Sequence, residues 1–265
     1  MPPVTIYLTV QDKKMSLSKI HNCYVNDITW NDAATCNCQI GDQVDIYRIG
    51  IAANLSHLNN LSTLLNAAET ARGKRYFQLN DKNRFIISRG ALRIILGKYL
   101  NQQAAAIEFE MGLNKKPFVN NTNGVPVCYN VSHSGDWIVI AVAASEIGVD
   151  TELINHTFEF KDIIAEYFSP GEINYINGEQ SCERFFKLWT RKEALTKATA
   201  KGLDDGLKFI PGLDGDHSVR ADMIGSAKDW TVSSFELYKN YVASVAGSAH
   251  ANELRFWEIT LKQQQ

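Results

Sequence analysis

One segment in the second half of the sequence constrains the fold more than any other. Residues 185–202 are predicted to form a single helix, because apolar side chains recur in them at helical spacing and Gly202 stands where a glycine would end such a helix. The recurring apolar residues are Phe185, Leu188, Trp189 and Leu195. On the other side of this helix, Glu193 and Lys197 would stack one turn apart and address the same point in space. An isolated pair at this spacing is most often a surface ion pair worth about 0.3 kcal/mol, so its meaning depends on the rest of the chain.

The composition is that of a globular protein with no general attraction to nucleic acid or membrane. The 265 residues are 45% hydrophobic, which is enough for one large core or two modest ones, and the formal net charge is -2. The sequence has no apolar run of about 18 residues that would span a bilayer. Because residues 1–14 lack the basic lead of a signal peptide, a cytoplasmic protein is expected.

The cysteines are predicted to be free thiols. They are odd in number and scattered, and Cys36-Asn-Cys38 has neither a second cysteine pair nor histidines nearby at zinc-ligand spacing. The five are Cys23, Cys36, Cys38, Cys128 and Cys182.

Hydrophobic periodicity predicts a mixed α+β fold. Strands are expected at residues 4–10, 23–30, 43–51, 128–133, 137–143, 147–154, 230–238, 241–247 and 254–261, the last three of them antiparallel. Helices are expected from residue 58 to 75 and from 85 to 100, and another begins at the capping box Ser169-Pro-Gly-Glu172. This order suggests two similar halves, residues 44–145 and 146–265, preceded by an extension of unclear role at residues 1–43.

Two segments have opposite and strongly asymmetric charge. Between Arg72 and Lys98 eight basic residues accompany one acid, whereas between Glu146 and Glu172 seven acids accompany one lysine. Aromatic residues are sparse in the basic segment, so a nucleic-acid partner is not favoured. Three of its arginines are predicted to form a solvated helix face and are left outside the candidate site, namely Arg84, Arg89 and Arg93.

Three carboxylates form the candidate metal site. Asp150 and Glu152 point to the same face of a predicted strand, about 7 Å apart along the chain, and Glu193 comes from the central helix. Oxygen ligands of this kind suit Mg²⁺, with Mn²⁺ as a plausible substitute, and Mg²⁺ usually keeps phosphate or water in its remaining positions. A phosphorylated substrate is therefore implied, although acidic residues most often only solvate a surface.

Four motifs in this order resemble the signature of the 4′-phosphopantetheinyl transferases. They are Asn114-Lys-Lys116-Pro117, Asn130-Val-Ser132-His133-Ser-Gly-Asp-Trp, Ile147-Gly-Val-Asp150-Thr-Glu152 and Leu188-Trp-Thr-Arg-Lys192-Glu193-Ala-Leu-Thr-Lys197. The resemblance covers roughly residues 72 to 210 and is to the larger, monomeric, two-lobed type that serves peptide synthetases and polyketide synthases. It implies that family's fold, in which the two halves are related by a pseudo-two-fold axis.

The resemblance also implies an activity and a role for each matching residue. The family transfers the phosphopantetheine arm of coenzyme A to a serine of an apo acyl or peptidyl carrier protein and releases adenosine 3′,5′-bisphosphate. Asp150, Glu152 and Glu193 match the magnesium ligands, and Lys197 would offset phosphate charge. Either Glu193 or a metal-bound water would take the serine proton. The remaining matches would hold the phosphates of coenzyme A, and they are Arg72, Lys116, Ser132 and His133.

Two further expectations qualify this picture. Basic residues that precede the equivalent of Arg72 in some members are replaced here by Glu69-Thr-Ala, so the grip on the adenosine phosphate is expected to differ. Lys192 matches the family but is predicted to face away from the site.

The alternative function is a catalytically silent protein that binds coenzyme A or a carrier, which would not require the metal ligands. For carrier docking, the candidates are Phe118 and Val119 with Lys115, and the other interpretation of Phe118 is a core residue.

Overall fold

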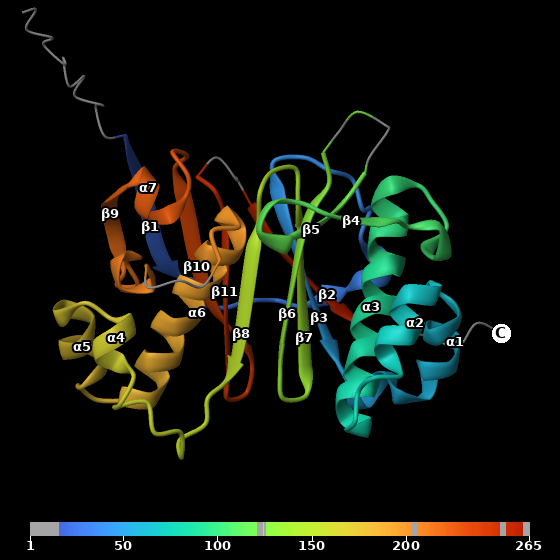
Figure 1. Cartoon of the computed structure of the whole chain (residues 1–265), viewed down its shortest axis with the longest axis horizontal. Helices are drawn as coiled ribbons and strands as arrows, with labels where there is room; N and C mark the ends of the chain where they lie inside the picture. The colour runs from blue at the N-terminus through green and yellow to red at the C-terminus, as the bar shows by residue number, and fades with distance from the viewer. Residues whose placement is uncertain (1–15, 121–123, 125, 203–205, 250–252, 262–265) are drawn as a thin grey trace, which may run out of the picture.

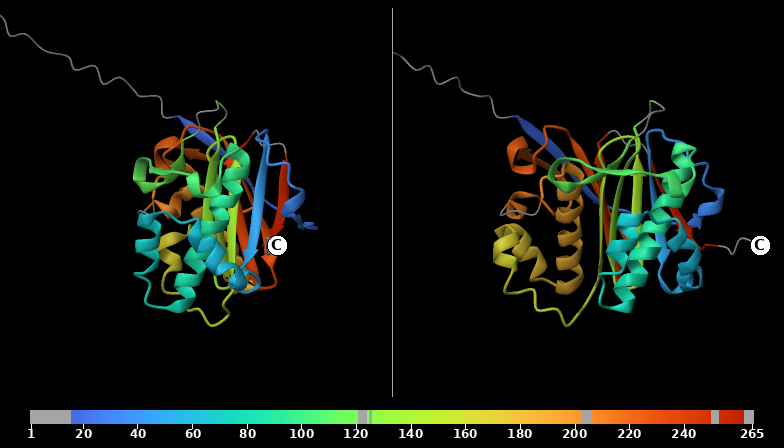
Figure 2. Two further views of the ribbon diagram at one scale, coloured as in Figure 1. Left: turned by 90° about the vertical axis from the view of Figure 1, so that its right-hand side faces the viewer. Right: turned by 45° about the vertical axis from the view of Figure 1, so that its right-hand side comes forward.

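The protein has two five-stranded mixed sheets with helices packed against them (Figure 1). The computed structural model describes residues 16–120, 124, 126–202, 206–249 and 253–261. Figure 2 shows the strands gathered on one side of the molecule and most of the helices on the other. The predicted α+β class with two halves is confirmed.

The sheet of the C-terminal half has the strand order β8-β11-β10-β1-β9. Its strands are β8 (Gly148–Leu153), β11 (Tyr241–Ser248), β10 (Trp230–Tyr238), β1 (Leu17–Tyr24) and β9 (Gly215–Arg220). β1 runs parallel to β10, with Ile20 opposite Trp230, and antiparallel to β9. Part of residues 1–43 therefore lies inside this sheet. The predicted strand at 23–30 is wrong, because the strand ends at Tyr24, and the one at 4–10 lies outside the described residues.

The sheet of the N-terminal half has the order β2-β12-β3-β7-β6. Its strands are β2 (Asn31–Asp32), β12 (Glu253–Ile259), β3 (Gln43–Gly50), β7 (Trp137–Ala143) and β6 (Cys128–Ser134). The predicted hairpin of β6 and β7 is confirmed. The expectation that β12 continues an antiparallel run is wrong, because β12 crosses to this sheet and pairs parallel with β3, Phe256 opposite Ile46. A small hairpin joins β4 (Phe109–Met111) to β5 (Pro117–Val119).

Each half has one long helix. The helices are α1 (Leu58–Thr63), α2 (Ala67–Gly73), α3 (Leu79–Leu100), α4 (Ile164–Tyr167), α5 (Pro170–Ile176), α6 (Ser181–Thr199) and α7 (Ala221–Ile224). Short 3-10 helices lie at Ala33–Thr35, Ala52–His57, Ala104–Ala106, Leu113–Lys115 and Leu207–Phe209. The capping box that begins α5 is confirmed, whereas α6 ends before Gly202, at Ala200 in the left-handed conformation. The single helix predicted from 58 to 75 is divided into α1 and α2.

The cores explain how the halves are joined. Apolar residues of α3 and of one face of the N-terminal sheet form one cluster, with Ile87 and Tyr47 among them. A second cluster takes residues from both sheets, including Ile46 of β3 and Val245 of β11. Because alternate residues of β3 face different clusters, this strand is covered on both faces. The two sheets therefore share a core, and their edge strands β6 and β8 lie side by side there (Figure 1).

Candidate functional site

Side chains of β6 bridge the junction to β8. Residues 130, 132 and 134 lie two apart on one face of β6. The Asn130 Oδ1 atom accepts from the Val149 backbone N–H at 2.9 Å, and Ser132 Oγ donates to Asp150 Oδ1 at 2.8 Å. Ser134 Oγ donates to Glu152 Oε2 at 2.8 Å. The motif around His133 thus fixes both carboxylates of β8 in place.

Asp150 is the centre of this arrangement. Its side chain is buried, and Lys197 Nζ donates to the Oδ1 atom at 2.7 Å. Lys197 Nζ also contacts Ser132 Oγ at 3.1 Å. The ion pair of Lys197 therefore joins it to β8, not to Glu193 on its own helix. The second oxygen of Asp150, Oδ2, is buried and has no hydrogen-bond partner among the described residues.

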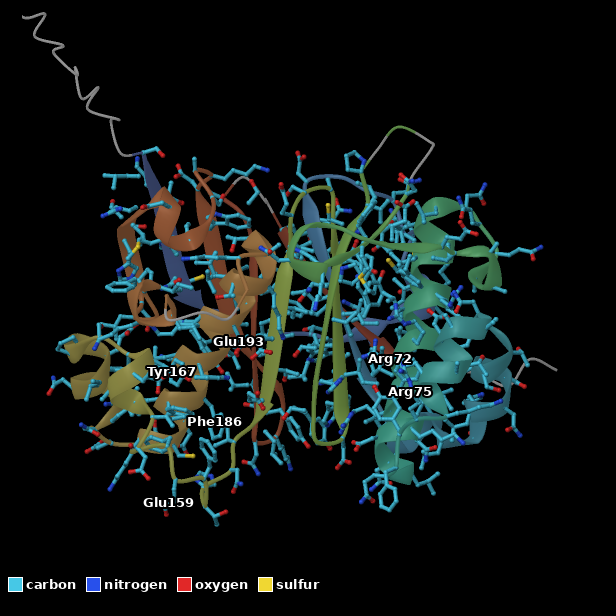
Figure 3. All side chains as sticks on the ribbon, viewed as in Figure 1. Arg72, Arg75, Glu159, Tyr167, Phe186 and Glu193 are labelled. Atoms are coloured by element: carbon cyan, nitrogen blue, oxygen red, sulfur yellow. The ribbon has the colours of Figure 1, made fainter. Side chains whose placement is uncertain are left out.

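Glu193 lies on α6 beside the same strand (Figure 3). It is 8% exposed, and within the described ranges its carboxylate neither accepts a hydrogen bond nor forms an ion pair. Burial, aided by the negative charge of Asp150 and opposed by Lys197, raises the pKa of Glu193 to about 7. Burial and Asp150 also raise the pKa of Glu152. Two carboxylates with raised pKa values in one place are typical of a functional site.

A glycine allows α6 to approach β8 closely. A Cβ atom at Gly148 would lie 2.0 Å from the Ala194 carbonyl oxygen and 2.4 Å from the Ala198 backbone nitrogen. No side chain fits there, so glycine is required at this point of the Ile-Gly-Val-Asp motif. The close approach brings Glu193 and Lys197 to the carboxylates of β8.

The other charged residues of α6 hold the helix in the fold. Arg191 is 1% exposed and donates to Ser234 Oγ at 2.7 Å and to the carbonyl oxygen of Cys23 on β1 at 2.9 Å. Lys192 is fully buried and pairs with Glu172 at 3.0 Å. Lys192 therefore faces away from Glu193, as predicted. Arg191 and Lys192 therefore anchor α6 in the fold, whereas Glu193 and Lys197 lie where the helix meets β8.

A basic pocket of about 300 Å³ lies on the other side of β6. Arg72 and His133 line it, so His133 and its neighbour Ser132 serve opposite sides of one strand. Burial and the charge of Arg84 lower the pKa of His133. Figure 3 shows Arg72 across the central strands from Glu193. The pocket is also lined by polar residues that the sequence analysis did not assign to a site, among them Tyr76, Arg84, Ser88, Arg89 and the acid Asp81, which pairs with Arg84.

The prediction that Arg84, Arg89 and Arg93 form a solvated helix face is wrong. Arg93 is fully buried, and its guanidinium pairs with Glu69 at 2.8 Å. Arg89 pairs with the same carboxylate at 3.3 Å, and Arg84 lines the basic pocket. The capping box of α2 was a local signal for Glu69, but its pairing with Arg93 depends on how α2 packs on α3.

Lys116 lies apart from the basic pocket. Its Nζ atom donates to the carbonyl oxygens of Ile147 and Ala198, each at 2.9 Å, and so ties β8 to the end of α6. Burial lowers the pKa of Lys116. Beside it, Phe118 is 38% exposed and borders a cavity of about 540 Å³ between the halves.

The described part of the chain contains no cluster of three or more His, Cys, Asp or Glu residues arranged to hold a metal ion. The site nevertheless fits a cation in two respects. Asp150 Oδ2 is a buried oxygen without a partner, and Glu193 is a buried carboxylate whose charge Lys197 offsets only in part. Hard carboxylate oxygens of this kind are the donors that Mg²⁺ prefers.

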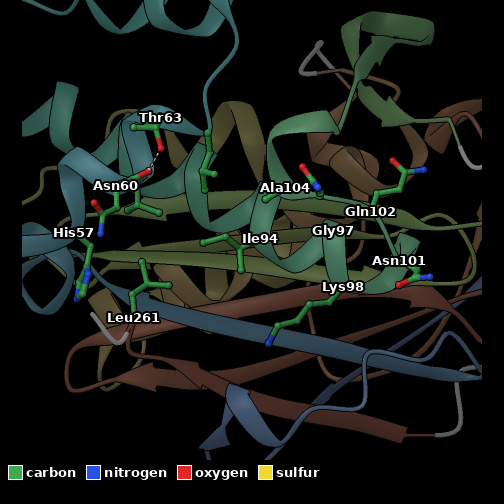
Figure 4. A pocket seen from close by; sticks show the side chains of 13 residues that line it. His57, Asn60, Thr63, Ile94, Gly97, Lys98, Asn101, Gln102, Ala104 and Leu261 are labelled. Carbon is green, nitrogen blue, oxygen red and sulfur yellow. Dashed lines mark hydrogen bonds between the residues drawn. The ribbon is translucent and has the colours of Figure 1, made fainter. Parts of the chain in front are cut away.

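A larger cavity lies elsewhere. It measures about 920 Å³ and lies beside the end of α3, with His57, Lys98 and Leu261 in its wall (Figure 4). None of the candidate site residues lines it. Among the described residues, no helix is both long and apolar enough to cross a bilayer.

Comparison with known proteins identifies the family. The model described as "4'-phosphopantetheinyl transferase superfamily" matches residues 146–246, and that described as "4'-phosphopantetheinyl transferase, N-terminal" matches residues 52–145. The chain belongs to the 4′-phosphopantetheinyl transferase family. Both halves of the two-domain type are present, and the predicted family is confirmed.

Individual relatives agree with this assignment. The 4′-phosphopantetheinyl transferase psf-1 of Bacillus pumilus is 34% identical over 197 residues, 71% of this chain and 81% of that protein. The 4′-phosphopantetheinyl transferase HetI of Nostoc is 28% identical over 223 residues, 82% of this chain and 93% of that protein. The Synechocystis relative slr0495 is 36% identical over 151 residues, 56% of this chain and 61% of that protein.

Proposed function

We propose that this chain transfers the 4′-phosphopantetheine arm of coenzyme A to a serine of an apo acyl or peptidyl carrier protein, in a reaction that depends on Mg²⁺. The observation that carries the proposal is the group of charges where β8 meets α6. Asp150 and Glu193 are buried there beside Lys197, and a basic pocket lies on the opposite side of β6. Adenosine 3′,5′-bisphosphate would be the second product.

The metal would be held by Asp150 and Glu193, with Glu152 as the third carboxylate. The partnerless Oδ2 atom of Asp150 and the unpaired Glu193 carboxylate support this assignment. When bound, Mg²⁺ would supply positive charge to the pyrophosphate oxygens and stabilise the leaving group. Mn²⁺ would serve in its place, since it shares the preference for oxygen ligands.

Glu193 is the group of this site best suited to accept the serine proton. Its carboxylate is buried and makes no hydrogen bond in the described part of the chain, and burial raises its pKa to about 7 before a metal binds, a shift that a bound cation would oppose. A metal-bound water is the rival base, and Glu193 would then position that water. Lys197, held at 2.7 Å from Asp150, would offset negative charge on the transferred phosphate.

The basic pocket would bind the adenosine phosphates. Arg72 and His133 line it, and charge-assisted hydrogen bonds to phosphate are among the stronger polar contacts in proteins. Ser132 would contact phosphate between the basic pocket and the carboxylates of β8, since its hydroxyl already contacts Asp150 and Lys197. Lys116 stays a predicted phosphate contact, although it would have to release two backbone carbonyls to make one.

The test is mass spectrometry of purified apo acyl and apo peptidyl carriers after incubation with the protein, coenzyme A and Mg²⁺. We expect the carrier to gain the pantetheine arm on one serine, and adenosine 3′,5′-bisphosphate to appear in equal amount. Chelation with EDTA should stop transfer, and added Mg²⁺ or Mn²⁺ should restore it. Binding of coenzyme A without modification of any carrier that a reference transferase modifies would favour the silent binding protein instead.

A further inference from the structure

A pair of thiols lies in the N-terminal half, away from the site described above. Cys36 and Cys38 are buried at 9% and 7% exposure, and both sulfur atoms contact the Tyr47 hydroxyl, at 3.1 Å and 3.9 Å. The backbone N–H of Cys38 also donates to Cys36 Sγ at 3.3 Å. Two sulfurs are therefore held together around one hydroxyl group.

The hydroxyl belongs to a chain of hydrogen bonds that ends at a fixed charge. Tyr47 contacts the Tyr99 hydroxyl at 2.8 Å, and Tyr99 donates to Asp45 Oδ2 at 2.6 Å. Arg255 holds Asp45 with two hydrogen bonds, at 2.8 Å and 2.7 Å. Because the single proton of Tyr99 goes to Asp45, Tyr47 has one proton to give, either to Tyr99 or to a Cys36 thiolate.

The electrostatics divide the two sulfurs into a thiolate and a thiol. Interaction with the Cys38 side chain, followed by the hydrogen bonds of Tyr47 and of the Cys38 backbone, lowers the pKa of Cys36 to about 6 against the effect of burial. The same pairing and burial raise the pKa of Cys38, while the charge of Lys98 acts weakly in the other direction. Near neutral pH the pair therefore shares one proton, with a nucleophilic sulfur next to a protonated one.

A small cavity reaches one sulfur of this pair, that of Cys38, whereas Cys36 is not among the residues that line it. Cys38 lines a cavity of about 190 Å³ together with Tyr47, Lys98 and Leu261. In the described part of the chain no third His, Cys, Asp or Glu ligand joins the two thiols, so a metal site is not favoured. Cys128 and Cys182 differ from Cys36, since burial raises the pKa of both.

We propose that Cys36 and Cys38 form an oxidation site, a dithiol that closes to a disulfide when a hydroperoxide reaches it. The Cys36 thiolate attacks one peroxide oxygen, the O–O bond breaks, and the products are a sulfenic acid and hydroxide. The Cys38 sulfur then attacks the sulfenic sulfur, the S–O bond breaks, and the S–S bond forms as its proton leaves with the oxygen as water. In sum, the thiolate and the thiol lose two electrons and one proton, and hydrogen peroxide is reduced to one hydroxide and one water.

The test uses the full chain and needs no transferase assay. The protein is treated with hydrogen peroxide in small excess at neutral pH, denatured with N-ethylmaleimide and mapped by peptide mass spectrometry. We expect the peptide containing both cysteines to lose two hydrogens and escape alkylation, and a reductant to reverse this. Cys23, Cys128 and Cys182 should remain alkylated. Oxidation of Cys182 before this pair, or conversion of Cys36 to a sulfinic acid without a disulfide, would overturn the proposal.

Variants separate the roles of the two sulfurs. In Cys38→Ser, Cys36 should accumulate as a sulfenic acid that dimedone traps, because its resolving thiol is gone. Tyr47→Phe should slow disulfide formation by about fivefold or more, because the thiolate loses a donor. Cys182→Ser is the matched control and should oxidise like the unmodified protein. An unchanged rate in folded Tyr47→Phe would exclude the hydroxyl as a contributor, and the wild-type mapping decides the proposal if a variant does not fold.

Discussion

The two helical units of the molecule, α2 with α3 and α5 with α6, use the same device for a structural purpose. In each, a glutamate in the capping box of the short helix also pairs with a buried cation of the long helix. Glu69 caps α2 and pairs with Arg93 at 2.8 Å, and Glu172 caps α5 and pairs with Lys192 at 3.0 Å. A carboxylate that closes a cap and neutralises a buried charge fixes the angle between two helices.

The units differ in the charges that remain. The long helix α3 directs Arg84 and Arg89 towards a basic pocket, whereas α6 directs Glu193 and Lys197 towards the carboxylates of β8. The scaffold is thus similar in the two halves while the electrostatic role is opposite. Arg93 and Lys192 therefore serve folding, whereas the charges that face the basic pocket or β8 are available for function, and Arg89 does both because it also pairs with Glu69.

The first prediction tests the shared device and has the largest expected effect. Glu172→Ala and Glu69→Ala should each lower the free energy of unfolding by about 3 to 5 kcal/mol, because each leaves a buried cation without its partner. Urea denaturation measures this. Glu166→Ala, on the exposed surface of α4, is the control and should change little. Losses below about 1 kcal/mol in both variants would show that the capping glutamates are not structural equivalents.

The second prediction concerns Glu193, one of the charges of α6 that face β8. Glu193→Gln should lower kcat by on the order of 100-fold or more, because a preorganised charged group at the reaction centre is lost. Its fold should be intact, since Glu193 makes no hydrogen bond within the described ranges. Kinetics of carrier modification measure the effect, with Glu166→Gln as the matched control. Turnover near that of the unmodified protein would remove Glu193 from the site.

The third prediction uses pH to sharpen the contrast between structural and functional charges. The pKa of Glu193 is raised from 4.5 to about 7, so between these values the folded protein binds more protons than the unfolded chain. The free energy of unfolding of the metal-free protein should therefore fall as the pH rises through this range, by up to about 3 kcal/mol. The difference between the unmodified protein and Glu193→Gln isolates this contribution. A difference that does not change with pH would mean that burial does not perturb Glu193.

The smallest expected effect is at the junction of the halves. Phe118 is 38% exposed beside the cavity that both halves border. Phe118→Ala should raise the KM for the carrier about fivefold, as loss of an exposed apolar contact of about 1 kcal/mol would do. The KM for coenzyme A and the melting temperature should not change. A large fall in melting temperature would identify Phe118 as a structural residue.

The sequence predicted those parts of the fold that depend on neighbouring residues. The periodic helices α3 and α6, the hairpin of β6 and β7 and the capping box of α5 were all predicted from local patterns. The direction of β12 was not, because its alternation is the same for a parallel and an antiparallel partner, and that partner, β3, lies far away in sequence. β9 was missed because its exposed and half-buried residues are mostly polar.

In the candidate site, too, the sequence predicted the features that depend on neighbouring residues and missed the contacts between distant segments. Asp150 and Glu152 were placed on one face of a strand by the alternation of β8 alone. The role of Arg93 was not predictable from its own segment, since its partner Glu69 lies in another helix. The contacts of Lys116 with two backbone carbonyls likewise depend on how the halves meet. A motif identifies the residue types, whereas the packing decides which atoms they reach.

The measurement that tests the central claim most directly is calorimetric titration of coenzyme A with and without Mg²⁺. We expect the carboxylates of β8 and α6 and the basic pocket to bind different phosphates of one coenzyme A molecule. Mg²⁺ should then tighten the binding of coenzyme A to the unmodified protein, and Asp150→Asn should abolish that gain. Arg72→Ala should weaken binding about tenfold whether or not Mg²⁺ is present, and dephospho-coenzyme A should conceal this defect. A gain from Mg²⁺ that persists in Asp150→Asn, together with normal binding by Arg72→Ala, would contradict the division of labour between the two halves.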